Sequence, residues 1–108
     1  MGRLRDRVAV ITGGATGIGG AASEMYGAEG ALSIVVDYNS TEGEVLVERI
    51  RQAGGRAEFH ALDVRSAEQT AEVFGRIGAT HGRIDVLVCN AGVLMGAYNG
   101  IADLEEEA

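Results

Sequence analysis

The sequence predicts an α/β fold in which a parallel β-sheet is covered by helices on both faces. Short apolar runs alternate along the chain with stretches whose apolar residues recur at helical spacing. The first apolar run has no polar alternation, which is typical of a strand buried on both faces of a parallel sheet. The links are short, so successive strands are expected to be joined by right-handed crossovers through helices. We expect a single domain, residues 1–108.

The first strand is expected over residues 7–12 and the first helix over residues 17–29. Ile18 and Met25 lie at helical spacing and are expected on the apolar side of this helix. Gly27 falls inside the helix, and an interior glycine costs about 1 kcal/mol relative to alanine. The skewed balance of 17 glycines and no proline therefore predicts modest stability.

The second strand is expected over residues 32–36 and ends at Asp37. Thr41 and Glu44 have the spacing of a capping box, so they are expected to begin the second helix. The glycine pair at residues 54–55 is expected to end it.

The third strand is expected over residues 57–62. Ser66 and Gln69 form a second capping box, which predicts a third helix that stops near Gly82. The fourth strand follows over residues 84–88.

Residues 103–108, four of which are acidic, resemble the first turn of a fourth helix, because acids are favoured at a helix N-terminus. Between the fourth strand and this turn the sequence is irregular. The expected order is therefore four strands alternating with helices, with a further helix beginning as the chain ends.

A glycine-rich turn follows the first strand, over residues 13–19. Its glycines let the backbone turn tightly and approach a ligand closely. A helix that opens at Gly17 would direct its free N–H groups and its dipole at that turn, which suits a phosphate or pyrophosphate. The chain contains no lysine, so a phosphate-binding loop of the Gly-Lys-Ser/Thr type is excluded. The turn is expected to hold its ligand through backbone groups.

Composition excludes several classes of function. The net charge is −7, which argues against a nucleic-acid partner. No apolar run is long enough to span a membrane, and the N-terminus lacks the apolar core of a signal peptide. The single cysteine, Cys89, excludes an internal disulfide and a cysteine-based metal site, and it suits a reducing cytoplasm. We expect a cytoplasmic protein that binds neither a membrane nor a metal.

Three motifs in order give the chain its resemblance to a known family. They are Thr12-Gly13-x-x-x-Gly17-x-Gly19, Asp63-Val64 and Cys89-Asn90-Ala91-Gly92. The chain resembles the amino-terminal, cofactor-binding half of the short-chain dehydrogenases/reductases, whose third motif has asparagine in place of Cys89. The resemblance covers essentially all of the chain, and it implies a Rossmann-like sheet in the strand order 3-2-1-4, truncated relative to the family.

The resemblance implies a cofactor site at the first motif. There Thr12, Gly13, Gly17 and Gly19 belong to the pyrophosphate turn, and Ile18 adds backbone contacts. Glycine motifs are weak evidence alone, and Gly17-x-Gly19-x-x-Ala22 also fits another dinucleotide fingerprint in a different register.

The resemblance also predicts NAD rather than NADP. Asp37 ends the second strand, 18 residues after Gly19. An acid there accepts hydrogen bonds from the adenosine ribose hydroxyls and repels a 2′-phosphate. Thr16 stands where NADP-preferring members often carry a basic residue. A solvated acid after a strand is the alternative interpretation of Asp37.

The two later motifs would complete the cofactor site. By resemblance, Asp63 and Val64 flank the adenine, although Asp63 could also only initiate a turn. Asn90, Ala91 and Gly92 would pass along the cofactor and brace the fourth strand, and Asn90 is expected to be structural rather than catalytic.

The chain departs from the family in its catalytic residues. The family uses a serine and a Tyr-x-x-x-Lys pair, and a chain without lysine cannot contain that pair. The residues four places after its three tyrosines are Gly30, Glu42 and Ala102. We therefore expect the family's oxidoreductase ancestry without turnover by this chain alone, and no catalytic residue is assigned.

Two alternatives remain open at this stage. One is a stand-alone nucleotide-binding or association module, because the exposed apolar edge over residues 86–88 of the fourth strand would favour a homo-oligomer. The other is a fold similar to that of the methyltransferases that bind S-adenosylmethionine, which also use a glycine turn after the first strand and an acid after the second. The later motifs fit the dehydrogenase pattern better.

Overall fold

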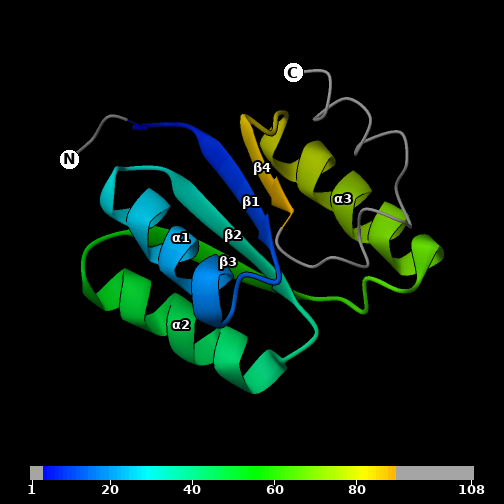
Figure 1. Cartoon of the computed structure of the whole chain (residues 1–108). Helices are drawn as coiled ribbons and strands as arrows, with labels where there is room; N and C mark the ends of the chain where they lie inside the picture. The colour runs from blue at the N-terminus through cyan, green and yellow to red at the C-terminus, as the bar shows by residue number, and fades with distance from the viewer. Residues whose placement is uncertain (1–3, 90–108) are drawn as a thin grey trace.

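The computed structural model describes residues 4–89 and forms a four-stranded parallel sheet in the order β3-β2-β1-β4. Helices α1 and α2 cover one face of the sheet, and α3 covers the other (Figure 1). The elements are β1 (Val8–Thr12), α1 (Gly17–Ala28), β2 (Leu32–Asp37), α2 (Ser40–Gln52), β3 (Arg56–Ala61), α3 (Ala67–His81) and β4 (Val86–Cys89). The predicted fold class, element order and strand order are confirmed. The helix expected over residues 103–108 lies outside the described residues.

The central strands are buried on both faces, as their unbroken apolar sequences predict. All five residues of β1 are buried. On the α3 face, Val10 and Ile34 pack with Val73 and Ile77 of the helix. On the other face, Val35 packs with apolar residues of α2 and β3. The alternation of side chains along each strand thus supplies two separate apolar layers.

Helix α1 packs through small residues, and the expectation that Ile18 and Met25 face the core is wrong. Their side chains are 80% and 54% exposed. The buried residues of α1 are Gly19, Gly20, Ser23 and Gly27. A Cβ at Gly27 would lie 2.8 Å from Cγ2 of Ile50, so the missing side chain lets α1 and α2 approach closely. The helical cost of Gly27 is therefore offset by packing.

Side chains cap the N-termini of α2 and α3. Oδ1 of Asn39 accepts a hydrogen bond from the backbone N–H of Glu42 at 3.0 Å, so α2 begins two residues before the predicted Thr41–Glu44 box. Both pairs have capping-box spacing, and the chain uses the earlier one. Oγ of Ser66 accepts from the backbone N–H of Gln69 at 3.1 Å, which confirms the predicted start of α3.

The amino ends of β1 and β4 are joined by the carboxylate of Asp85. Its Oδ2 accepts from the backbone N–H of Val8 at 2.8 Å, while Arg83 and Arg7 lie on the same carboxylate at 2.8 and 3.6 Å. Hydrogen bonds from Arg83 and then from Val8 lower the pKa of Asp85. This end of the sheet is closed by the protein's own groups.

A second polar cluster ties β3 to the end of α3. Oε2 of Glu58 lies 3.0 Å from Nε2 of His60 and 3.1 Å from Nε2 of His81. Burial opposes ionisation of Glu58, but these hydrogen bonds lower its pKa on balance. Among residues 4–89, no group of three or more His, Cys, Asp or Glu side chains is arranged to hold a metal ion. Across the same residues, no helix is both long and apolar enough to cross a membrane.

Candidate functional site

The candidate site lies at the carboxyl edge of the sheet, where β1, β2 and β3 end. Strand β1 lies between β2 and β4, and the helices that follow β1 and β3 cover opposite faces (Figure 1). Ligands of open α/β sheets bind in the crevice at such a switch in winding direction, outside the carboxyl ends of the strands. The topology therefore directs attention to the turns after Thr12, Asp37 and Ala61.

The turn after β1 is built from glycines in conformations that other residues rarely adopt. Gly13 has a φ of 62° and Gly17 a φ of 60°. A Cβ at Gly14 would lie 2.6 Å from the carbonyl oxygen of Ile11, so the turn folds tightly back on β1. A Cβ at Gly17 would meet nothing within 4 Å, so the space beside it is open. The turn is compact on its inner side and accessible on its outer side.

The N-terminus of α1 differs from those of α2 and α3 because no side chain caps it. Thr16 is the N-cap residue, and its side chain makes no capping hydrogen bond. The first N–H groups of a helix have no acceptor within the helix, and the helix dipole adds positive potential there. Gly17, Ile18 and Gly19, which open α1, therefore offer backbone donors to an anion.

Thr12 contributes to the site by fixing the start of the turn. It is fully buried, and its Oγ1 donates a hydrogen bond to the carbonyl oxygen of Val88 at 3.2 Å. This bond ties the carboxyl ends of β1 and β4 together, so its side chain has a structural role in the described residues.

Asp37 holds the glycine turn against the start of α2. Its Oδ2 accepts from the backbone N–H of Ala15 at 3.0 Å, and its Oδ1 accepts from that of Asn39 at 2.9 Å. Each carboxylate oxygen has two lone pairs, so these bonds leave acceptor capacity for a further donor. Sequence reasoning placed Asp37 at the site without foreseeing these backbone contacts.

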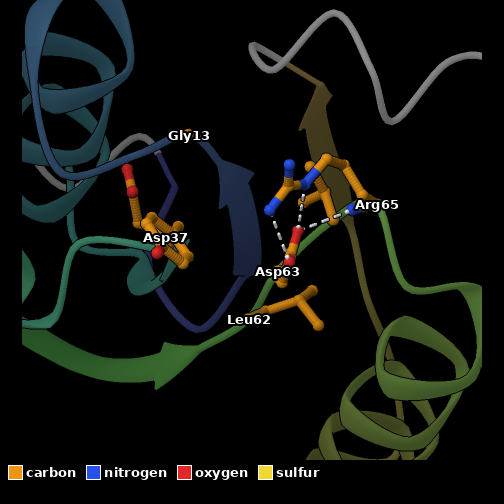
Figure 2. Close-up of a pocket in the computed structure, with 7 residues that line it drawn as sticks. Gly13, Asp37, Leu62, Asp63 and Arg65 are labelled. Atoms are coloured by element: carbon orange, nitrogen blue, oxygen red, sulfur yellow. Dashed lines mark hydrogen bonds and ion pairs between the residues drawn. The ribbon is translucent and has the colours of Figure 1, made fainter.

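A cavity of about 340 Å³ lies between the ends of β1, β2 and β3 (Figure 2). Its lining residues are Gly13, Asp37, Tyr38, Leu62, Asp63, Val64 and Arg65. The structure thus brings together four of the residues predicted from separate motifs, Gly13, Asp37, Asp63 and Val64. Thr16 and Gly17 line a second hollow, between α1 and α2.

Asp63 forms a forked ion pair with Arg65 at the cavity (Figure 2). Nε of Arg65 donates to Oδ1 of Asp63 and Nη2 donates to Oδ2, both at 3.0 Å. Oδ1 also accepts from the backbone N–H of Arg65 at 3.0 Å. The hydrogen bonds from the Arg65 side chain, followed by that from its backbone, lower the pKa of Asp63. Asp63 is therefore held as a carboxylate.

Arg65 is the residue that motif reasoning missed. The signal was present as a basic residue two places after Asp63, in the link between β3 and α3. The pairing depends on the turn that this link makes, where the backbone N–H of Ser66 also donates to the carbonyl oxygen of Asp63 at 2.9 Å. A sequence pattern does not specify that turn. Asn90, Ala91 and Gly92 lie outside the described residues.

These residues fit a dinucleotide. The open space beside Gly17 and the uncapped start of α1 suit a pyrophosphate, and the cavity beside Asp37 suits an adenosine. The sequence model of the family described as "short chain dehydrogenase" matches residues 7–108. The chain belongs to the short-chain dehydrogenase family.

Relatives of known sequence and structure agree with this membership in the short-chain dehydrogenases. The chain is 45% identical over 93 residues to the uncharacterised oxidoreductase YxbG of Bacillus subtilis (strain 168), covering 86% of this chain and 34% of that protein. It is 39% identical over 94 residues to cyclopentanol dehydrogenase of Comamonas sp. (strain NCIMB 9872), and the match covers 87% of this chain and 38% of that protein.

Solved structures of short-chain dehydrogenases show the same fold. A short-chain dehydrogenase/reductase from Burkholderia xenovorans superposes with a TM-score of 0.81 at 32% identity, covering 85% of this chain and 38% of that one. A metagenomic short-chain oxidoreductase in complex with NADP superposes with a TM-score of 0.80 at 38% identity, and the match covers 82% of this chain and 40% of that one. The chain thus spans between about a third and two-fifths of the length of these relatives.

Proposed function

We propose that this chain binds NAD(H) and forms the dinucleotide-binding part of a short-chain oxidoreductase. The observation that carries the proposal is the meeting of the uncapped N-terminus of α1, the Asp37 carboxylate and the Asp63 cavity at one edge of the sheet. Backbone N–H groups of Gly17, Ile18 and Gly19 would hold the pyrophosphate. Asp37 would accept from the adenosine ribose hydroxyls.

The remaining cofactor contacts follow from the same arrangement. Gly13 lines the cavity, where Asp63 and Val64 would border the adenine. Asn90, Ala91 and Gly92 would pass along the cofactor beyond β4. When bound, the nicotinamide ring supplies the hydride acceptor or donor of the oxidoreductase reaction.

We propose a preference for NAD over NADP from the charge of the site. Asp37 lies where an adenosine ribose would bind, and Asp63 is a second carboxylate on the same cavity. The one arginine of this cavity, Arg65, is already paired with Asp63. A 2′-phosphate would therefore meet the carboxylate of Asp37, which has no ion pair among residues 4–89, and would find threonine rather than a basic side chain at position 16.

The catalytic step is not assigned to residues of this chain. Without lysine, the chain cannot supply the Tyr-x-x-x-Lys pair of its family. We propose that these 108 residues bind the cofactor and do not turn over substrate by themselves. A spectrophotometric assay that detects NADH turnover by this chain alone would contradict this part of the proposal.

Calorimetric titration of the chain with NADH and NADPH tests the cofactor proposal. We expect saturable binding that favours NADH, and we expect Asp37→Ala to weaken NADH binding and to reduce the preference. Titration with S-adenosylmethionine is the competing arm, and tighter binding of that compound than of NADH would overturn the assignment. Absence of heat with either dinucleotide would mean that the motifs reflect ancestry and not binding.

We further propose that the chain self-associates through β4 in the cytoplasm. Among the described residues β4 pairs with β1 alone, and its residues Val86, Leu87 and Val88 are apolar. An unpaired apolar edge favours pairing with another chain. Light scattering that shows a monomer at micromolar concentration would refute the association.

A further inference from the structure

The forked pair of Arg65 and Asp63 leaves one acceptor position of Asp63 unused among the described residues. Within the described residues, Oδ1 of Asp63 accepts two hydrogen bonds, from Nε and from the backbone N–H of Arg65. Oδ2 accepts one, from Nη2. A carboxylate oxygen has two lone pairs, so Oδ2 retains capacity for a further donor. Asp63 lines the cavity, which places this capacity within reach of a ligand.

Arg65 fixes the direction in which Asp63 accepts. Three hydrogen bonds from one residue restrain the rotation of the carboxylate, and a planar guanidinium fork restrains it more than a flexible ammonium would. In Figure 2 the guanidinium lies beside the carboxylate of Asp63, and dashed lines mark the hydrogen bonds between them. Leu62 lines the same cavity and supplies an apolar surface for a ring.

The chemistry of an ionised carboxylate decides which ring fits. A carboxylate accepts hydrogen bonds and donates none, so it favours an exocyclic amino group and repels an exocyclic oxygen. We propose that Arg65 is a positioning residue that holds Asp63 as an acceptor for the amino group of a 6-aminopurine and against a 6-oxopurine. This inference rests on the proposed dinucleotide binding and adds the specificity of its base subsite.

The amino end of the sheet supplies a matched control. Arg83 and Asp85 are also two residues apart, and Nε and Nη2 of Arg83 donate to the carboxylate of Asp85 at 2.8–3.1 Å. Arg83→Ala therefore removes the same charge and the same kind of fork as Arg65→Ala. Asp85 lies at the amino ends of β1 and β4, whereas the cavity lies at the carboxyl ends of β1, β2 and β3.

The test compares NADH with reduced nicotinamide hypoxanthine dinucleotide, which differs in having an oxo group in place of the amino group. Calorimetric titration gives the ratio of the two Kd values for the unaltered chain, Arg65→Ala, Arg65→Lys and Arg83→Ala. We expect the unaltered chain to prefer NADH about tenfold, because a site built around a hydrogen bond rejects an analogue that lacks it. In Arg65→Ala the preference for NADH should fall below about threefold. The preference in Arg65→Lys should lie between those of the unaltered chain and Arg65→Ala. Arg83→Ala should keep the full preference.

Each outcome separates the inference from the function on which it rests. If the unaltered chain binds neither dinucleotide, both proposals are overturned. If it binds NADH but shows no preference, or if Arg65→Ala keeps the preference, the dinucleotide function stands and the role of Arg65 is overturned. Circular dichroism checks the fold of each variant. Should Arg65→Ala fail to fold, Arg65→Lys decides, and an unchanged ratio in that variant overturns the inference.

Discussion

The two ends of the sheet use the same chemistry with different results. At the amino end, Asp85 binds Arg83, the backbone of Val8 and Arg7, so its acceptor positions are filled by the protein. At the carboxyl end, Asp63 binds Arg65 and still lines a cavity. An aspartate–arginine pair two residues apart is therefore no indicator of function by itself.

The two aspartate–arginine pairs differ in the path that the chain takes next to each of them. At the amino end, the backbone N–H of Asp85 donates to Val8, and the ladder between β1 and β4 begins directly. At the carboxyl end the chain turns away from the sheet after each strand, and the glycines after Thr12 keep side chains out of the space that is left. At the amino end the carboxylate is used within the protein, whereas at the carboxyl end a cavity remains beyond the strands.

The largest expected effect comes from overpacking the inner side of the glycine turn at the carboxyl end. Gly14→Val would place a side chain against the carbonyl oxygen of Ile11 and against Ser23, and overpacking of this kind costs about 3 kcal/mol. Urea unfolding measures the loss. Gly75→Val is the matched control, because a Cβ at Gly75 meets nothing within 4 Å, and a comparable loss there would contradict the steric explanation.

Exchanging the two aspartates for alanine should separate stability from binding. Asp85→Ala leaves the partly buried backbone N–H of Val8 without its acceptor, whereas Asp63→Ala does this to an exposed N–H of Arg65, which water can satisfy. The urea midpoint should therefore fall more in Asp85→Ala than in Asp63→Ala. Asp63→Ala should weaken NADH binding about tenfold, while Asp85→Ala leaves the Kd unchanged. Urea denaturation of the two variants tests the expected difference in stability, and calorimetric titration tests the expected difference in the Kd for NADH. Equal effects of the two variants on binding would remove the distinction between the ends.

Acid should weaken both pairs. Hydrogen bonds from Arg65 hold the pKa of Asp63 below its ordinary value of 3.8, and those from Arg83 do the same for Asp85. A carboxyl group whose pKa is lower in the folded state stabilises it above the unfolded pKa, and that contribution is lost as the pH falls through the folded pKa. The free energy of unfolding should therefore decline below about pH 4. The decline should be shallower in Arg83→Ala and in Arg65→Ala, and identical slopes in urea unfolding at each pH would rule out the linkage.

The smallest expected effect is a gain in the free energy of unfolding when a glycine that belongs to neither end of the sheet is replaced by alanine. Gly78 lies in α3, and a Cβ there would meet nothing within 4 Å. Gly78→Ala should raise the free energy of unfolding by about 0.5–1 kcal/mol, because alanine loses less backbone entropy in a helix. Gly27→Ala is the opposite case, since its Cβ would meet Ile50. A loss of stability in Gly78→Ala would show that α3 has packing that the structure does not contain.

Most of the fold follows from local sequence patterns, and the faces of the helices do not. The run from Val8 to Ile11 predicted a buried strand because no polar residue interrupts it, and the strand order followed from the family resemblance. For helix α1, the same reasoning from local sequence patterns gave the wrong face. Its apolar residues Ile18 and Met25 point outward because glycine and Ser23 bring the helix close to its neighbours. Apolar periodicity assumes that large side chains fill the contact, and here their absence creates it.

The sequence predicted which residues lie at the candidate site, because the motifs mark the ends of the strands. It did not predict which hydrogen bonds their side chains make. Gly13, Asp37 and Asp63 were placed at the ends of three strands from the sequence, and the structure brings them to one cavity. Their roles toward a cofactor stay predictions. The bonds of Asp37 to Ala15 and of Asp63 to Arg65 depend on turn geometry over distances that spacing does not encode.

The carboxylate of Asp37 also bears on how a ligand would be received. By accepting from Ala15 and Asn39, it joins the glycine turn to the start of α2 before any ligand arrives. The entropy of ordering these two segments is thus lost during folding and not during association. A preorganised site of this kind spends little of its intrinsic binding free energy on rearrangement. Asp37 would therefore act twice, first by joining the glycine turn to α2 and then as an acceptor for a ligand.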